Sequence, residues 1–263
     1  MNLASTAASA VRNLLIAGTA LALVATGAVV QAQAAADEAA VRFGARADVL
    51  DISLSPSGNK IVFVSAGPGH TEVVNVIDFT AEAAVKAVLT NGEKLVDIDS
   101  CEWASEVRLL CQFSGMGGAD GGILIPFDRL IALNADSTNI RMISQRDSPR
   151  ALGFNQFGGD VLALDVAGEE GMILMTRNFI PEMTVGTRLG NEKRGLGAEL
   201  VDIANGRSRI REQPDDATLR YIADEQGRVR VKMQAQRDSN GNLIGTFRYF
   251  FRTPDNNSWA PLE

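Results

Sequence analysis

Leu50-Asp-Ile-Ser-Leu54 is followed by Ser55-Pro-Ser-Gly-Asn59 and then by Lys60-Ile-Val-Phe-Val-Ser65. The outer segments alternate or concentrate apolar and β-branched residues, and the middle segment contains Pro and Gly, which favour turns. The stretch therefore predicts strand, turn and strand. A third strand is predicted at Glu72 to Asp78.

The same rhythm recurs three more times along the chain. The second group contains Val96 to Trp103, Val107 to Phe113, Arg129 to Asn134 and Asn139 to Ser144; the third contains Asp160 to Asp165, Gly171 to Arg177 and Ala198 to Ile203; the fourth contains Leu219 to Ala223, Arg228 to Gln234 and Gly245 to Thr253, and ends at Trp259. Groups of strands spaced about 45 to 60 residues apart are typical of propeller blades. The sequence predicts an all-β fold, a partial or small β-propeller of about four antiparallel blades. A β-sandwich is the alternative that the rhythm leaves open.

Two segments interrupt this rhythm. Ala81 to Leu89 has a helical composition but is interpreted as a connector between blades. The glycine-rich stretch from Ser114 to Gly122 resembles a phosphate cradle, yet it lacks a Gly-Lys-Ser or Gly-Lys-Thr ending and no helix follows it. It is interpreted as a flexible loop.

The N-terminal segment has the pattern of a signal peptide. Arg12 precedes an apolar run from Leu14 to Val30, and Ala32-Gln-Ala34 is a small-x-small cleavage site. We expect cleavage after Ala34, with Ala32 or Ala36 as alternatives, so residues 1–34 are the signal peptide and residues 35–263 the propeller-like domain. A retained membrane anchor is the competing interpretation, since about 17 apolar residues are near spanning length.

The charge balance limits the classes of partner. The chain has a formal net charge of −7, and cleavage would remove Arg12 and make it more acidic. Acidic, unclustered charge argues against nucleic acid or an anionic membrane as partner. Contact with a membrane is expected only through the signal segment before cleavage, and a periplasmic or secreted location is predicted.

Cys101 and Cys111 are the two cysteines of the chain. If Ser105 to Val107 form a hairpin turn, the two cysteines lie opposite each other on antiparallel strands, near disulfide distance. An oxidising compartment favours the bond, while two buried free thiols are the alternative. No His or Cys lies close enough in sequence to complete a zinc site, so no metal is expected.

The residues of a complete catalytic site are not found in the sequence. His70 is the single histidine and lies in the turn-like segment Gly67 to Thr71, and no Gly-x-Ser-x-Gly motif occurs. Many carboxylates are present, but no spacing singles out a pair for glycoside hydrolysis. The expectation is a protein that is not an enzyme as encoded, with no catalytic residues and no cofactor.

A long connection from Arg177 through Arg188 to Lys193-Arg194 gathers charge around Pro181. Long loops at a propeller rim often carry binding contacts, so Arg177, Glu182 and Arg188 are candidate binding residues. The alternative is an ordinary solvated loop.

Several motifs occur in an order that is similar to a known family. They are Phe43-Gly-Ala-Arg46, Ile52-Ser-Leu-Ser-Pro-Ser-Gly-Asn-Lys-Ile61, Cys101-Glu-Trp103 with Arg108-Leu-Leu-Cys111, Arg177-Asn178, and Tyr249-Phe-Phe-Arg-Thr253 closing on Trp259. Their order resembles the N-terminal propeller of bacterial prolyl oligopeptidase family proteins. The resemblance implies a propeller that caps an α/β-hydrolase domain and filters substrates by size, but it brings no catalytic residue to this chain.

Two hypotheses of function follow. The chain is either a non-catalytic propeller fragment of a prolyl oligopeptidase-like serine peptidase, acting in substrate gating or in binding of peptide or protein beside a separate hydrolase half, or a stand-alone periplasmic propeller that binds protein or peptide. A fragment of a larger propeller should expose apolar faces on its terminal blades.

Overall fold

The computed structural model describes residues 40, 42–118, 122–144 and 148–262. The predicted signal peptide, residues 1–34, lies outside the described residues. The chain divides into two units, Met1–Ala47 and Asp48–Glu263, and the second contains the strands. No helix in the described part of the chain has the length and apolar character needed to cross a membrane.

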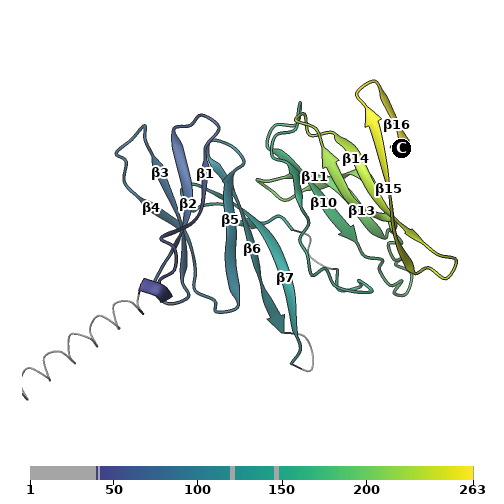
Figure 1. The fold of residues 1–263 in the computed structure, drawn as a ribbon, viewed down its shortest axis with the longest axis horizontal. Helices are drawn as coiled ribbons and strands as arrows, with labels where there is room; N and C mark the ends of the chain where they lie inside the picture. Colours follow the sequence, from purple (N-terminus) through teal and green to yellow (C-terminus); the bar gives the residue numbers. More distant parts are fainter. Residues whose placement is uncertain (1–39, 41, 119–121, 145–147, 263) are drawn as a thin grey trace, which may run out of the picture. The chain divides into compact units, whose positions relative to one another are not determined.

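The described residues form four antiparallel sheets, each a meander of four strands (Figure 1). Blade 1 contains β1 (Val49–Leu54), β2 (Lys60–Ala66), β3 (Glu72–Asp78) and β4 (Lys86–Asn91); blade 2 contains β5 (Val96–Trp103), β6 (Arg108–Gly118), β7 (Leu124–Asn134) and β8 (Arg141–Met142). Blade 3 contains β9 (Val161–Ala163), β10 (Met172–Phe179), β11 (Gly195–Asp202) and β12 (Ser208–Asp215); blade 4 contains β13 (Thr218–Ala223), β14 (Val229–Arg237), β15 (Leu243–Thr253) and β16 (Asn256–Leu262). The prediction of a small propeller of about four blades is confirmed.

Three buried apolar clusters join successive blades. The first joins blades 1 and 2, the second joins blades 2 and 3, and the third joins blades 3 and 4. The first strands of neighbouring blades also meet, β1 with β5 and β9 with β13, as in a propeller, where the first strand of each blade lines the axis. Among the described residues, no buried cluster combines blade 4 with blade 1, and β1 pairs with β2 rather than with the last blade.

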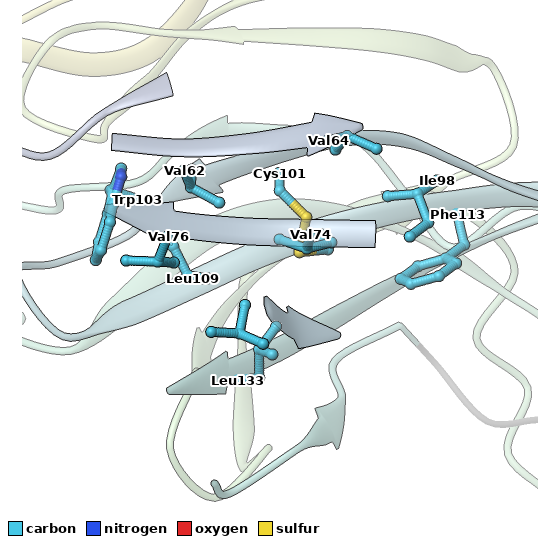
Figure 2. Close-up of a cluster of buried hydrophobic side chains, with 12 residues drawn as sticks. Val62, Val64, Val74, Val76, Ile98, Cys101, Trp103, Leu109, Phe113 and Leu133 are labelled. Carbon is cyan, nitrogen blue, oxygen red and sulfur yellow. A yellow bond between two sulfur atoms is a disulfide. The ribbon is translucent and has the colours of Figure 1, made fainter. Parts of the chain in front are cut away.

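The cluster between blades 1 and 2 contains the disulfide bond (Figure 2). Cys101 and Cys111 are directly paired across β5 and β6, with Trp103 opposite Leu109, and the two sulfur atoms are bonded. Both cysteines are fully buried, and four valines of β2 and β3 pack in the same cluster: Val62, Val64, Val74 and Val76. The predicted disulfide and hairpin register are confirmed.

The sequence interpretation differs from the structure in four segments. Part of the stretch interpreted as a connector, Ala81 to Leu89, belongs to strand β4, which pairs with β3. The glycine-rich stretch interpreted as a loop continues β6 as far as Gly118, which pairs with Leu124. Strand β12 was not predicted, and the segment of β16 was given only as the end of the fourth group, at Trp259.

Candidate functional site

A hairpin of blade 2 extends beyond the sheet that carries it. Pairing between β5 and β6 ends at Val96 and Gly115, followed by a hydrogen bond of 2.8 Å from the Met116 N–H to the Leu95 carbonyl. Strands β6 and β7 continue pairing to Gly118 and Leu124. The end of the hairpin is therefore a two-stranded ribbon, with one edge of β6 no longer paired with β5.

The glycines of this ribbon make room for an aromatic ring. A Cβ atom on Gly115 would lie 2.4 Å from the Leu95 carbonyl oxygen and 3.1 Å from the ring of Phe127. A Cβ atom on Gly117 would lie 3.4 Å from the same ring. Phe127, on the neighbouring strand, covers the glycine backbone, an arrangement that stabilises glycine within strands. This packing explains why a glycine-rich segment forms a strand here.

The segment that follows blade 2 forms the opposite wall of a groove. The guanidinium of Arg129 donates hydrogen bonds to the carbonyl oxygens of Asp128 (2.6 Å), Gln156 (2.8 Å) and Asn155 (3.1 Å). Between this wall and the ribbon lies a cavity of ≈ 470 Å³. Its lining consists of Gly117, Gly118, Ile125, Pro126, Phe127, Arg129, Phe154, Asn155 and Gln156. We name this cavity the rim groove.

Two charged residues at or beside the rim groove, Arg129 and Asp128, have partners within the protein. Arg129 lies 5.4 Å from the centroid of the Phe127 ring, in addition to its three carbonyl partners. Asp128 accepts a hydrogen bond of 2.5 Å from the Gly158 N–H, and burial raises the pKa of its carboxyl group. The groove thus offers apolar and aromatic surface beside an Arg129 guanidinium that is already paired, which suits an uncharged ligand segment better than a charged one.

Exposed apolar side chains occur on the two segments that contribute to the groove. Ile123 is 64% exposed, Leu124 52%, Phe154 60% and Phe157 59%. They come from the β6–β7 hairpin and from the segment between blades 2 and 3. Of these four residues, Phe154 lines the groove itself.

The predicted rim-loop residues Glu182 and Arg188 lie in a segment that Arg150 joins to the chain following blade 2. Arg150 forms an ion pair with Glu182 and donates hydrogen bonds to the carbonyls of Met183 (3.2 Å) and Leu189 (3.3 Å). Arg188 is exposed and exchanges backbone hydrogen bonds with Val185 in a tight turn. Glu182 is thus held in place by Arg150, while Arg188 is open to solvent.

Arg177 lies in a different environment. Its Nη1 donates to Glu199 Oε1 at 2.7 Å, and its guanidinium is 4.5 Å from the centroid of the Phe179 ring. It lines a separate cavity of ≈ 280 Å³ together with Ser144 and Thr176. No contact described in the structure joins Arg177 to Glu182 or Arg188, so the three candidates do not form one site.

His70 lies in an exposed turn between β2 and β3, closed by a hydrogen bond from the Gly67 N–H to the Thr71 carbonyl. In the part of the chain that the structure describes, no group of three or more His, Cys, Asp or Glu side chains is arranged to hold a metal ion. The rim groove, with its mostly apolar and aromatic lining, is the candidate site. Sequence reasoning did not find Phe127, Arg129 and Phe154, because they come together only through the fold.

The fold defines a propeller-like protein of four consecutive blades. No family model matches the chain, and no match was found among curated proteins. Solved structures with similarity include TolB from Acinetobacter baumannii, with a TM-score of 0.36 and 12% identity over 78% of this chain and 40% of that one.

Two further structures are similar at the same level. A Synechocystis apocarotenoid oxygenase mutant has a TM-score of 0.40 and 11% identity, covering 80% of this chain and 49% of that one. A 6-phosphogluconolactonase-type protein from Bacteroides uniformis has a TM-score of 0.32 and 11% identity, covering 80% and 69%. The chain spans less than half the length of TolB and of the oxygenase. None of these comparisons shows the prolyl oligopeptidase family, and that resemblance stays a prediction.

Proposed function

We propose that this chain is an exported, non-catalytic propeller that binds extended, largely apolar peptide segments in the rim groove. The observation that carries the proposal is the groove itself, ≈ 470 Å³ in volume and lined by Ile125, Pro126, Phe127 and Phe154. Its size is within the range of about 300 to 1,000 Å³ that is usual for ligand sites, and its lining is mostly apolar, as in such sites.

The glycines of the ribbon support an extended peptide rather than a compact small molecule as ligand. Glycine within a strand lets a ligand or another backbone approach the strand closely. Gly117 and Gly118 of β6 line the rim groove, and among the described residues no atom lies within 4 Å of the place of a Cβ on Gly118. A peptide backbone can therefore lie close to the face of β6 inside the groove.

The disulfide supports the exported location of the proposal. Disulfides persist in oxidising compartments such as the bacterial periplasm. The Cys101–Cys111 bond is buried among apolar side chains. A protein with such a bond in its core is suited to an envelope or extracellular location.

Fluorescence anisotropy with a labelled peptide of alternating Leu and Ser residues tests the binding site. We expect saturable binding by the wild-type chain and at least tenfold weaker binding by Phe154→Asp, a loss of about 1.4 kcal/mol. The matched control is Leu189→Asp, because Leu189 is 81% exposed and does not line the groove. Equal binding by wild type and Phe154→Asp would overturn the proposed site.

The family resemblance implies a specific version of this peptide-binding role, in which the propeller controls which substrates reach a serine peptidase. The non-catalytic part of the proposal is tested by incubating the purified chain with a fluorogenic proline-containing peptide. We expect no hydrolysis. Turnover that a serine-directed reagent abolishes would show a catalytic site and contradict the proposal.

A further inference from the structure

The face of blade 1 that points away from blade 2 is apolar. Val62, Val64, Val74 and Val76 pack toward blade 2, so the alternate residues of β2 and β3 point the other way. Ile61 and Phe63 of β2 are paired with Leu54 and Ile52 of β1, and Ile61 is also paired with Ile77 of β3. Ile52 is 60% exposed and Leu54 59%. These residues form the outer face of blade 1.

The face of blade 4 that points away from blade 3 is also apolar. Lys232 lies beside the ring of Trp259, at 5.0 Å from its centroid, and Trp259 packs against the cluster shared with blade 3. The neighbours of Lys232 in β14, Val231 and Met233, therefore point the other way. They are paired with Phe251 and Tyr249 of β15, and Tyr249 is paired with Leu262 of β16.

Several residues of this outer face of blade 4 are open to solvent. Tyr249 is 45% exposed and Leu262 56%, and Phe247, paired with Ala235, is 49% exposed. Both terminal blades of the chain thus expose apolar faces, as the sequence analysis expected for a propeller fragment.

Both outer faces can be buried without leaving many polar groups unpaired. On blade 1, Asn75 Nδ2 donates to Ser65 Oγ at 2.8 Å and to the Val73 carbonyl at 3.1 Å, so its amide nitrogen is already paired. On blade 4, Arg220 is paired with Met233 on the first strand of the sheet, where its long side chain can extend to solvent. Burial of these faces therefore costs little in polar desolvation.

We propose that a second copy of this chain covers both faces, with the outer face of blade 4 of each copy packed on the outer face of blade 1 of the other. Each internal cluster already joins one face of a blade to the opposite-facing side of the next blade in the chain. The outer face of blade 4 and the outer face of blade 1 of a second copy would form one further contact of this kind. In the dimer, every blade has both faces covered and the blade order continues from one copy into the other.

The area of the faces favours a pair of contacts over a single one. Four strands about 4.8 Å apart and about six residues long at about 3.3 Å each make a face of roughly 15 by 20 Å, or roughly 300 Å². One contact therefore buries roughly 600 Å² on both partners together, the size of a crystal contact. Two contacts related by a two-fold axis bury roughly 1,200 Å², which reaches the size of specific interfaces.

Sedimentation velocity of the chain, expressed with its own N-terminus, tests the dimer. We expect a species of twice the chain mass. Ile52→Asp and Tyr249→Lys should each give monomers, because each places a charge in both contacts of the dimer. Leu189→Asp, which changes an exposed loop residue outside both faces, should stay dimeric.

Mixing the two charged variants tests the pairing of faces. A mixed dimer has one unaltered contact and one contact in which Asp and Lys lie on opposite faces, so we expect an equimolar mixture to recover dimers. A monomeric wild type, an open polymer that grows with concentration, or a dimer that Ile52→Asp disrupts but Tyr249→Lys does not would each overturn the proposal. Circular dichroism establishes that both variants are folded.

Discussion

The guanidinium of Arg108 on β6 donates two hydrogen bonds to the carbonyl oxygen of Ile203, at 3.1 Å from Nε and 2.5 Å from Nη2, across the boundary between blades 2 and 3. Its Nη1 donates to Asn134 Oδ1 and to the Asn139 carbonyl on its own blade. Arg108 is only 4% exposed, and this burial lowers the pKa of the guanidinium. One buried side chain thus ties two blades together.

Arg108→Met should destabilise the chain by about 2 to 4 kcal/mol, because it leaves buried carbonyl groups without their charged donor. The midpoint of urea unfolding measures this loss. Arg209→Met is the control, since Arg209 is largely exposed and its ion pair with Glu169 should contribute less than about 1 kcal/mol. Equal effects of the two substitutions would show that the Arg108 contacts do not hold the blades together.

Reduction of the Cys101–Cys111 bond should lower the free energy of unfolding by about 3 kcal/mol. The two cysteines are 10 residues apart in sequence, and closing a loop of that size restricts the unfolded chain by about this amount. Urea unfolding with and without a reductant measures the difference. The Cys101→Ala, Cys111→Ala double variant should be insensitive to the reductant, and an unchanged wild-type midpoint would contradict the prediction.

Glu102→Gln should stabilise the chain at neutral pH. Burial raises the pKa of Glu102 above its ordinary value, with a smaller contribution from the charge of Asp51. Because the pKa of Glu102 is higher in the folded state than in the unfolded state, the contribution of Glu102 to the stability of the folded state is fully present at pH values below the unfolded-state pKa. This contribution is lost as the pH rises through the pKa of the folded state. We therefore expect a Tm about 1 to 2 °C higher for the variant at pH 8 and no difference at pH 4. Exposed Glu192→Gln is the control. A higher Tm of Glu102→Gln at pH 4 alone would contradict the prediction.

Arg150→Met should loosen the segment from Pro181 to Leu189 without unfolding the blades. Arg150 holds this segment through Glu182 and two carbonyl groups. Limited proteolysis should cleave the variant in this segment several times faster than the wild type, while the urea midpoint changes by less than about 1 kcal/mol. Arg188→Met, which changes an exposed side chain of the same segment, should leave the cleavage rate unaltered.

Sequence patterns located most strands because each strand has its own local signal. The hairpin of β5 and β6 is the clearest case, since the spacing of Cys101 and Cys111 fixes its register. Strand β12 was missed because its segment contains charged residues and Pro214, and its exposed and half-buried positions alternate as in a solvated edge strand. Such a strand is specified by pairing with β11 and hardly by its own composition.

Long-range contacts explain the other differences between the sequence predictions and the structure. The segment from Ala81 to Leu89 is rich in residues that favour helix, and pairing with β3 overrides that preference from Lys86 onward. The rim groove was not predicted because Phe127 and Phe154 are brought together only by the fold. Of the predicted binding residues, Glu182 and Arg188 lie in the segment held by Arg150, while the contacts of Arg177 with Glu199 are made within blade 3.

The serial order of the blades has a consequence for biosynthesis. Each blade completes the pairing of its four strands within one short stretch of chain, and each buried cluster joins blades that are consecutive in the sequence. The polypeptide can therefore acquire structure vectorially as it is synthesised, one meander after another, before its C-terminal blade is complete.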